Sequence, residues 1–161
     1  MPFTLTQQVI AHADNLLVRH RRVYTIDLTL HLPPATSANA QYSQLKKLLD
    51  WVKASASQYH LVGYAVCHLA HHPEGGRLRG IAYLLPCADS VLWYAGLVTH
   101  LQQHLPEAGL LSTTEQPETV YVGYSHEVVR LHTRLSAWTQ QADHIPADQR
   151  LWCLSPERLM Q

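Results

Sequence analysis

Residues 23–32 read VYTIDLTLHL, and they carry the clearest structural pattern in the chain. Apolar residues fill one side of the pattern, at Tyr24, Ile26, Leu28, Leu30 and Leu32. The other side is mostly polar and holds Val23, Thr25, Asp27, Thr29 and His31. Because successive side chains of a strand point to opposite faces, this alternation predicts a β-strand with one apolar face.

The segments on either side of this strand predict further helices and strands. Apolar residues at helical spacing predict helices at residues 6–20, from 36 or 37 to 57, from 89 or 90 to 105, and 125–141. Three more strands are expected at residues 61–70, 77–85 and 119–124, with the turn-rich stretch 71–76 as a hairpin loop. The tail, residues 142–161, is expected to be irregular and to dock on the body through Ile145, Leu151, Trp152 and Leu154.

The order α-β-α-β-β-α-β-α predicts one α+β domain spanning residues 1–161. Its β-α-β-β-α-β core gives a four-stranded antiparallel sheet backed by two helices, which is a ferredoxin-like plan. The domain divides into an N-terminal helix (1–22), a sheet core (23–124) and a C-terminal helix with the tail (125–161). The second face of the sheet is left to the extra helices, to solvent or to a ligand, and the polar side of 23–32 lines it.

The composition describes a folded globular domain, because 47% of the 161 residues are apolar and only 15% are charged. Lys and Arg total 12, as do Asp and Glu, so we do not expect a protein that holds nucleic acid mainly by bulk charge. A net charge of zero does not exclude local basic patches. No run approaches the roughly 18 apolar residues of a membrane helix, and the N-terminus lacks a secretory signal. We therefore expect a cytoplasmic protein without a membrane partner.

Histidine and cysteine add two expectations. The 12 histidines make the net charge rise steeply as the pH falls through about 6.5. The three cysteines, Cys67, Cys87 and Cys153, form no CxxC motif and indicate reduced thiols rather than a disulfide framework.

Several segments resemble, in order, the replication-initiator-like proteins of filamentous phages and the related YagK/YfjJ C-terminal domain. The resembling segments are residues 12–22 and 24–33 (YTIDLTLHLP), then 63–66 (GYAV), 77–86 and 138–155. The resemblance implies a fold of the HUH-endonuclease type. In that family a His-hydrophobic-His pair on the third strand holds a divalent metal, an acidic residue assists, and a tyrosine on the last helix attacks DNA.

The chain departs from this family pattern at each catalytic position. The His-x-His position reads Arg77-Leu78-Arg79, the acidic position aligns with Leu69, and the tyrosine position is Ala137. Guanidinium groups do not ligate cations, and alanine cannot attack a phosphate. The resemblance therefore implies a scaffold that has lost its nuclease chemistry and needs no cofactor.

Arg77 and Arg79 lie two residues apart on a predicted strand, so they project to the same face. We expect this face to be the one that carries Asp27 and His31. One interpretation is an ion pair between arginine and Asp27 that fills the vacated metal position. The other is a binding patch for an anion or phosphate. Both can hold at once.

Two further clusters have ordinary explanations that we favour. His68, His71 and His72, beside Cys67, are weak candidates for a metal site, but they are expected mainly in an exposed loop. Arg19, Arg21 and Arg22 could contact nucleic acid, although a solvated helix end is the commoner reason for such a cluster. Trp51 lies off the apolar stripe of its helix and could mark a binding surface.

These observations favour a non-catalytic binding protein of a phage or other mobile genetic element, acting on a host protein or nucleoprotein complex. An inhibitor of a bacterial defence system such as CRISPR–Cas is one such role. The alternative is a metal-dependent DNA-nicking replication initiator with displaced residues, namely Asp27, His31, His68 and either Tyr121 or Tyr124. A second alternative is a DNA- or RNA-binding regulator that uses the open face of the sheet.

Overall fold

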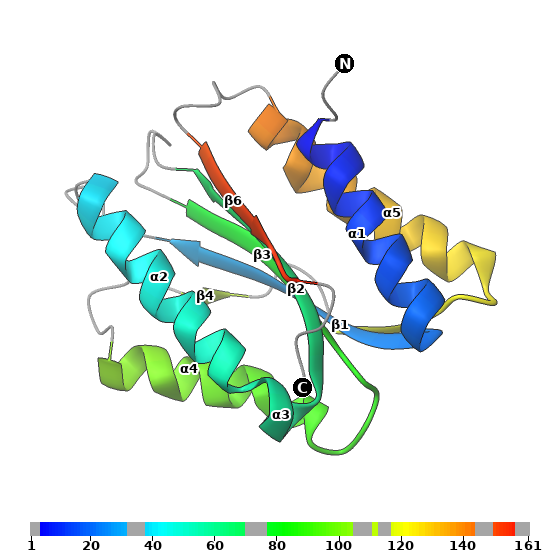
Figure 1. Cartoon of the computed structure of the whole chain (residues 1–161), viewed down its shortest axis with the longest axis horizontal. Coiled ribbons are helices and arrows are strands. Elements are labelled where there is room, and N and C mark those ends of the chain that lie inside the picture. Colours follow the sequence, from blue (N-terminus) through cyan, green and yellow to red (C-terminus); the bar gives the residue numbers. More distant parts are fainter. Residues whose placement is uncertain are drawn as a thin grey trace.

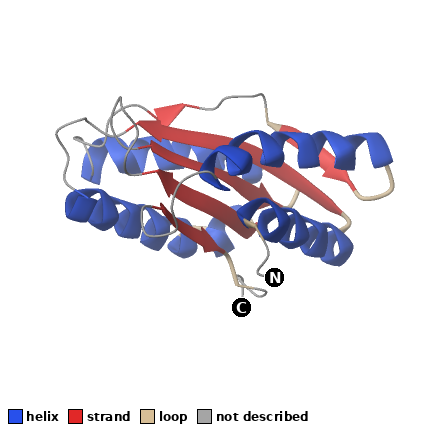
Figure 2. Cartoon of the chain, turned by 90° about the horizontal axis from the view of Figure 1, so that it is seen from above, coloured by secondary structure: helices blue, strands red, loops and turns tan. Residues whose placement is uncertain are grey.

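The computed structural model describes residues 4–31, 38–69, 77–104, 111–112, 117–143 and 150–156. Within these ranges a single sheet lies between two pairs of helices (Figure 1). Figure 2 shows the same layers from above. One face is covered by α1 (Leu5–His20) and α5 (Ser125–Asp143), and the other by α2 (Ala38–Ala54) and α4 (Trp93–His104). None of the helices in these ranges is long and apolar enough to cross a membrane.

Local side-chain contacts set the helix ends. The Thr4 hydroxyl accepts the backbone N–H of Gln7 while the Gln7 side chain accepts that of Thr4, which is a capping box at the start of α1. The predicted second helix is interrupted at Ser55, where α2 gives way to α3 (Ala56–Tyr59). The Ser55 hydroxyl donates to the Val52 carbonyl, an alternative to continued helix that serine offers readily. A short 3-10 turn, η1 (Ser90–Leu92), precedes α4.

The four predicted strands are present in one antiparallel sheet. They are β1 (Arg22–His31), β2 (Leu61–Leu69), β3 (Arg77–Leu84) and β5 (Glu118–Tyr121). β1 pairs with β3 and β5, and β3 also pairs with β2. The hairpin loop predicted at 71–76 lies outside the described residues.

Two short strands that were not predicted extend this sheet. β4 (Leu111–Ser112) pairs with β1, and β6 (Arg150–Leu154) pairs with the outer edge of β2. The expectation of a wholly irregular tail is therefore wrong at 150–154. A five-residue strand has little periodicity of its own, and the unpaired edge of β2 offers the hydrogen bonds that order it.

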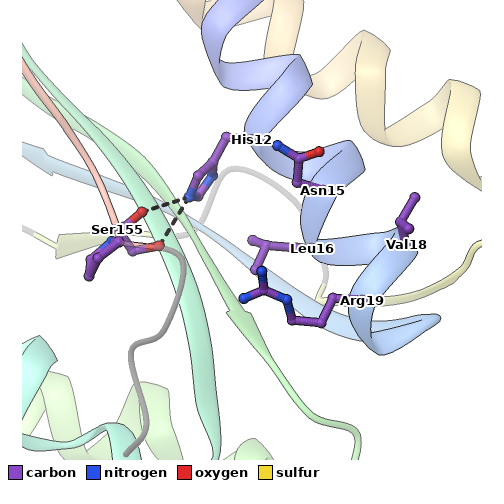
Figure 3. A pocket seen from close by; sticks show the side chains of 7 residues that line it. His12, Asn15, Leu16, Val18, Arg19 and Ser155 are labelled. Atoms are coloured by element: carbon purple, nitrogen blue, oxygen red, sulfur yellow. Dashed lines mark hydrogen bonds between the residues drawn. The ribbon is translucent and has the colours of Figure 1, made fainter.

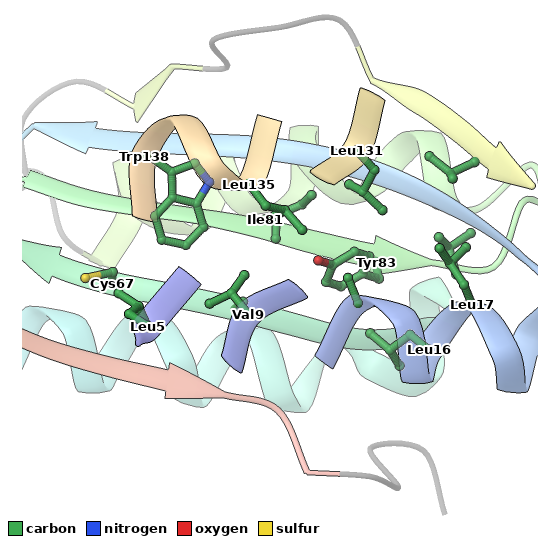
Figure 4. Close-up of a cluster of buried hydrophobic side chains, with 14 of the residues drawn as sticks. Leu5, Val9, Leu16, Leu17, Cys67, Ile81, Tyr83, Leu131, Leu135 and Trp138 are labelled. Carbon is green, nitrogen blue, oxygen red and sulfur yellow. The ribbon is translucent and has the colours of Figure 1, made fainter. Parts of the chain in front are cut away.

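Each face of the sheet has its own hydrophobic core. Ile26, Leu28 and Leu30 of β1 pack under Trp93 and Leu97 of α4. On the opposite face α1 and α5 pack over Val23, Ala65, Cys67, Ile81 and Tyr83 (Figure 4). The second face is therefore closed by the N-terminal and C-terminal helices, and the expectation that it offers an open binding surface is wrong where these helices lie.

The sheet leaves no room for a side chain at Gly80 of β3. A Cβ atom there would lie 2.8 Å from the Ala65 carbonyl oxygen, which is a backbone atom and cannot swing away. We expect Gly80→Ala to lower the free energy of unfolding by about 1–3 kcal/mol, as overpacked core substitutions do. Gly123→Ala is the comparison, because the three atoms nearest to its new Cβ, from 2.5 Å, belong to the Tyr121 side chain, which can turn away where a backbone carbonyl cannot. Urea unfolding followed by tryptophan fluorescence measures both, and equal losses would contradict the argument.

Candidate functional site at the arginine end of the sheet

The register of β1 and β3 brings the predicted site residues to one end of the sheet. Thr29 lies opposite Arg79, and His31 lies opposite Arg77. These positions alternate with the apolar residues that face α4, so their side chains lie on the face covered by α1 and α5. We call the group formed by Thr29, His31, Arg77 and Arg79 the arginine site.

The polar groups of the arginine site are largely withdrawn from water. Thr29 is buried, while His31, Arg77 and Arg79 are half-buried. Burial lowers the pKa of the Arg79 guanidinium from its ordinary value, the Asp27 carboxylate opposes this shift, and the neighbouring Arg77 adds to it. The Nε atom of Arg79 and the hydroxyl of Thr29 are buried without a hydrogen-bond partner in the described part of the chain. This end of the sheet therefore holds positive charge and unsatisfied polar groups.

Asp27 is held by a residue that the sequence analysis did not single out. Arg134 of α5 donates to Asp27 Oδ2 from both Nε (2.8 Å) and Nη2 (2.6 Å). Its Nη1 donates to the Thr25 hydroxyl and to Glu118 Oε2, each at 3.1 Å. Asp27 is only 5% exposed, so it cannot serve as a binding residue on an open face.

A signal for Arg134 exists in the sequence. Leu131, Leu135 and Trp138 form the apolar stripe of α5, and Arg134 lies on the same stripe. An arginine on a buried stripe needs a carboxylate partner, and Asp27 is the only acidic residue of the predicted strand 23–32. The Tyr83 hydroxyl is buried on the same face of the sheet, and burial raises its pKa.

Trp138 adds another donor to this face. Its indole Nε1 is buried and has no hydrogen-bond partner among the described residues. In Figure 4 Trp138 and Cys67 occupy the same end of the cluster, and Cys67 is the β2 neighbour of Arg79. Guanidinium and indole N–H groups only donate, and the Thr29 hydroxyl can do so. This combination suits an anion and does not suit a metal ion.

Among the described residues, the other candidates do not assemble into a second chemical site. His68 lies on β2, and its side chain is outside the described part, as are His71 and His72 altogether. No group of three metal-binding side chains occurs in the part of the chain that the structure describes. Trp51 of α2 is half-buried and packs against the hydrophobic core. Its ring stacks on that of His100 of α4, with the ring centroids 5.4 Å apart.

His31 and the two tyrosines suggested for a displaced nicking centre lie near opposite ends of β1. Tyr121 pairs with Arg22, the first residue of β1, whereas His31 is the last. A strand rises about 3.3 Å per residue, so the backbones at these two positions are about 30 Å apart. Tyr124 lies with Tyr121, their ring centroids 5.1 Å apart. A tyrosine and His31 therefore cannot act on one phosphate.

His12 of α1 and Ser155 meet in a pocket between α1 and the residues that follow β6 (Figure 3). His12 Nε2 lies 3.0 Å from Ser155 Oγ and 3.2 Å from the Ser155 carbonyl oxygen. In the tautomer that carries its proton on Nε2, the ring donates to the Ser155 carbonyl, because a carbonyl only accepts. Ser155 Oγ also accepts the backbone N–H of Tyr64 at 2.9 Å. The pair therefore joins α1 to the residue that follows β6.

The ion pair of Arg134 gives the first prediction for this region. We expect Arg134→Met to lower the free energy of unfolding by about 3–5 kcal/mol, because it removes a buried charged partner of the buried Asp27 carboxylate. Adding Asp27→Asn to Arg134→Met restores part of the loss. The control is Arg130→Met, whose ion pair with Glu118 is exposed and worth at most about 1 kcal/mol. Urea unfolding measures all variants, and an Arg134→Met loss no larger than the control's contradicts the assignment.

His12 gives a prediction about pH. Burial lowers its pKa below the ordinary 6.5, and the hydrogen bond to Ser155 only partly opposes this. The unfolded state therefore binds more protons than the folded state. The contribution of the neutral His12 ring to the free energy of unfolding is fully present above about pH 6.5 and is lost as the pH falls below it. His12→Gln should flatten the fall in unfolding free energy between about pH 6.5 and 5. Identical pH profiles for the two proteins would show that His12 does not contribute.

No family model, no curated protein and no solved structure matches this chain.

Proposed function

We propose that this chain is a non-catalytic binding protein whose arginine site receives an anionic group of a macromolecular partner. The observation that supports this most directly is the buried Nε of Arg79, which has no acceptor among the described residues and lies beside a second guanidinium. A guanidinium held away from water needs an acceptor, and its planar fork fits phosphate or carboxylate oxygens in paired hydrogen bonds. Asp27 does not fill this role alone, because Arg134 already binds it.

The partner we propose is a host protein or a nucleoprotein complex. Its acidic side chains or its phosphates are the groups that fit the arginine site. The chain has no net charge, so attraction over a long distance is weak and a local contact of matched shape must select the partner. Half-buried arginines are suited to such contacts, since arginine is enriched among the residues that dominate binding energy.

We also propose a fold type and an evolutionary origin for this chain. The neighbour order β5-β1-β3-β2, with α2 between β1 and β2 and α4 between β3 and β5, supports a ferredoxin-like core. The sequence resemblance to replication-initiator-like proteins supports descent from an HUH scaffold in a phage or other mobile element. Interference with a defence complex in the host cytoplasm, such as CRISPR–Cas, is the role we propose for such a scaffold without its nuclease residues.

Inorganic phosphate tests the arginine site. We expect it to raise the midpoint of thermal unfolding of the wild-type protein more than sodium chloride does at equal ionic strength. A ligand at about ten times its Kd adds about 1.4 kcal/mol when it binds only the folded state. The double variant Arg77→Gln/Arg79→Gln should lose this gain, whereas Lys53→Gln, an exposed charge on α2, should keep it.

The same variants test the partner and the absence of catalysis. Affinity capture from the natural host should recover a protein or nucleoprotein with the wild type and with Lys53→Gln, and fail to recover it with the double variant. Equal recovery by all three would refute the arginine site as the contact. Nicking of supercoiled DNA with Mg²⁺ or Mn²⁺, or a covalent protein–DNA adduct, would refute the non-catalytic assignment.

A further inference from the structure

A row of flat side chains lies at the end of β1 remote from the arginine site. The guanidinium carbon of Arg22 lies 5.2 Å from the centre of the Tyr121 ring. The Tyr121 and Tyr124 rings meet edge to face at 5.1 Å, and Tyr124 stacks on His126 at 5.9 Å with 29° between the planes. We call these four residues, Arg22, Tyr121, Tyr124 and His126, the aromatic row.

Backbone geometry builds the aromatic row. Arg22 and Tyr121 are direct cross-strand partners of β1 and β5. The chain then turns through Gly123, and the N–H of Tyr124 donates to the Tyr121 carbonyl at 3.0 Å. A Cβ at Gly123 would lie 2.5 Å from the Tyr121 ring, so the absent side chain is what lets that ring lie against the turn. His126 follows in the first turn of α5.

The aromatic row is exposed and does not stabilise the protein interior. The Tyr124 side chain is 55% exposed, Arg22 and His126 are exposed, and Tyr121 is half-buried. Within the described residues, neither tyrosine belongs to either of the two hydrophobic cores. Val122, between the tyrosines in sequence, is 37% exposed as well. Flat rings left in water in this way are typical of a contact surface.

The charges around the aromatic row are mainly positive. Arg19 and Arg21 are exposed at the end of α1, directly before Arg22. Two carboxylates lie nearby, and both are engaged. Glu118 accepts hydrogen bonds or ion pairs from Arg134 and Arg130, and Glu127 accepts the backbone N–H of Tyr121 at 3.4 Å. The surface therefore offers ring faces beside exposed arginines.

We propose that the aromatic row binds unpaired nucleotides of a single-stranded nucleic acid. The rings of Tyr121 and Tyr124 supply stacking surfaces for bases, and Arg21 and Arg22 contact the phosphates between them. An acidic peptide would use the arginines but not the ring faces. A duplex keeps its base faces inside its own stack, so it too would leave the rings unused. This goes beyond the proposed function, because it adds a second binding site about 30 Å of strand away from the arginine site.

Fluorescence anisotropy with labelled single strands tests the proposal. The probes are a thymidine and a uridine oligonucleotide of about 12 residues, together with a duplex of equal length. We expect both single strands to bind more tightly than the duplex. Tyr124→Ala should weaken binding at least about fivefold, whereas Tyr124→Phe, which keeps the ring, should bind like the wild type. Arg21→Gln/Arg22→Gln should reduce the slope of log affinity against log salt by about 0.7 for each phosphate that the two arginines neutralise.

Two controls separate this site from the rest of the molecule. Lys53→Gln removes an exposed positive charge on α2 and should leave binding unchanged. The arginine site has its own measurement, the thermal stabilisation by inorganic phosphate, so failure of the arginine site and failure of the aromatic row give different results. Circular dichroism checks that Tyr124→Ala is folded. Absence of single-strand binding by the wild type, duplex binding of equal strength, or equal binding by Tyr124→Ala would overturn the proposal.

Discussion

The buried ion pair between Arg134 and Asp27 constrains most of what surrounds it. Asp27 lies in the middle of β1, and a carboxylate there cannot stay charged beneath a hydrophobic helix without a partner of opposite charge. Arg134 supplies that charge from α5 and also donates to Thr25 and Glu118. These contacts tie α5 to β1 and β5 at one register. The face that the polar side of β1 could have left open is thereby closed.

Closing this face moves possible binding functions to the two ends of β1. At one end the half-buried Arg77 and Arg79 extend past the carboxylate that Arg134 holds. At the other end Arg22 and Tyr121 begin the aromatic row. The polar groups in the middle of β1 stabilise the fold, whereas the polar groups at its two ends are exposed or half-buried. A protein with no net charge can in this way hold two cationic sites without attracting polyanions over its whole surface.

Much of the element order was predictable, because it depends on local periodicity. The alternation at 23–32 and the helical spacing at 6–20 and 125–141 correspond to β1, α1 and α5 within a few residues. β4 and β6 were not predictable, since strands of two and five residues are ordered by the edges they pair with. The shared face of Arg77, Arg79 and His31 followed from strand spacing once β1 and β3 were recognised. Arg134 was missed although its place on the apolar stripe of α5 indicated a buried charge.

The amino-acid sequence by itself determined which segments are helices and strands and which side chains alternate, because these depend on neighbours within a few residues. It also determined that no bulk charge is available for holding a polyanion. Only the tertiary structure decided that α1 and α5 cover the second face, that Asp27 belongs to Arg134, and that the tyrosines and His31 stand at opposite ends of one strand. Those outcomes join residues more than 100 positions apart, such as Arg134 and Asp27, which are 107 apart, and such contacts are selected by packing and by the pairing of buried charges.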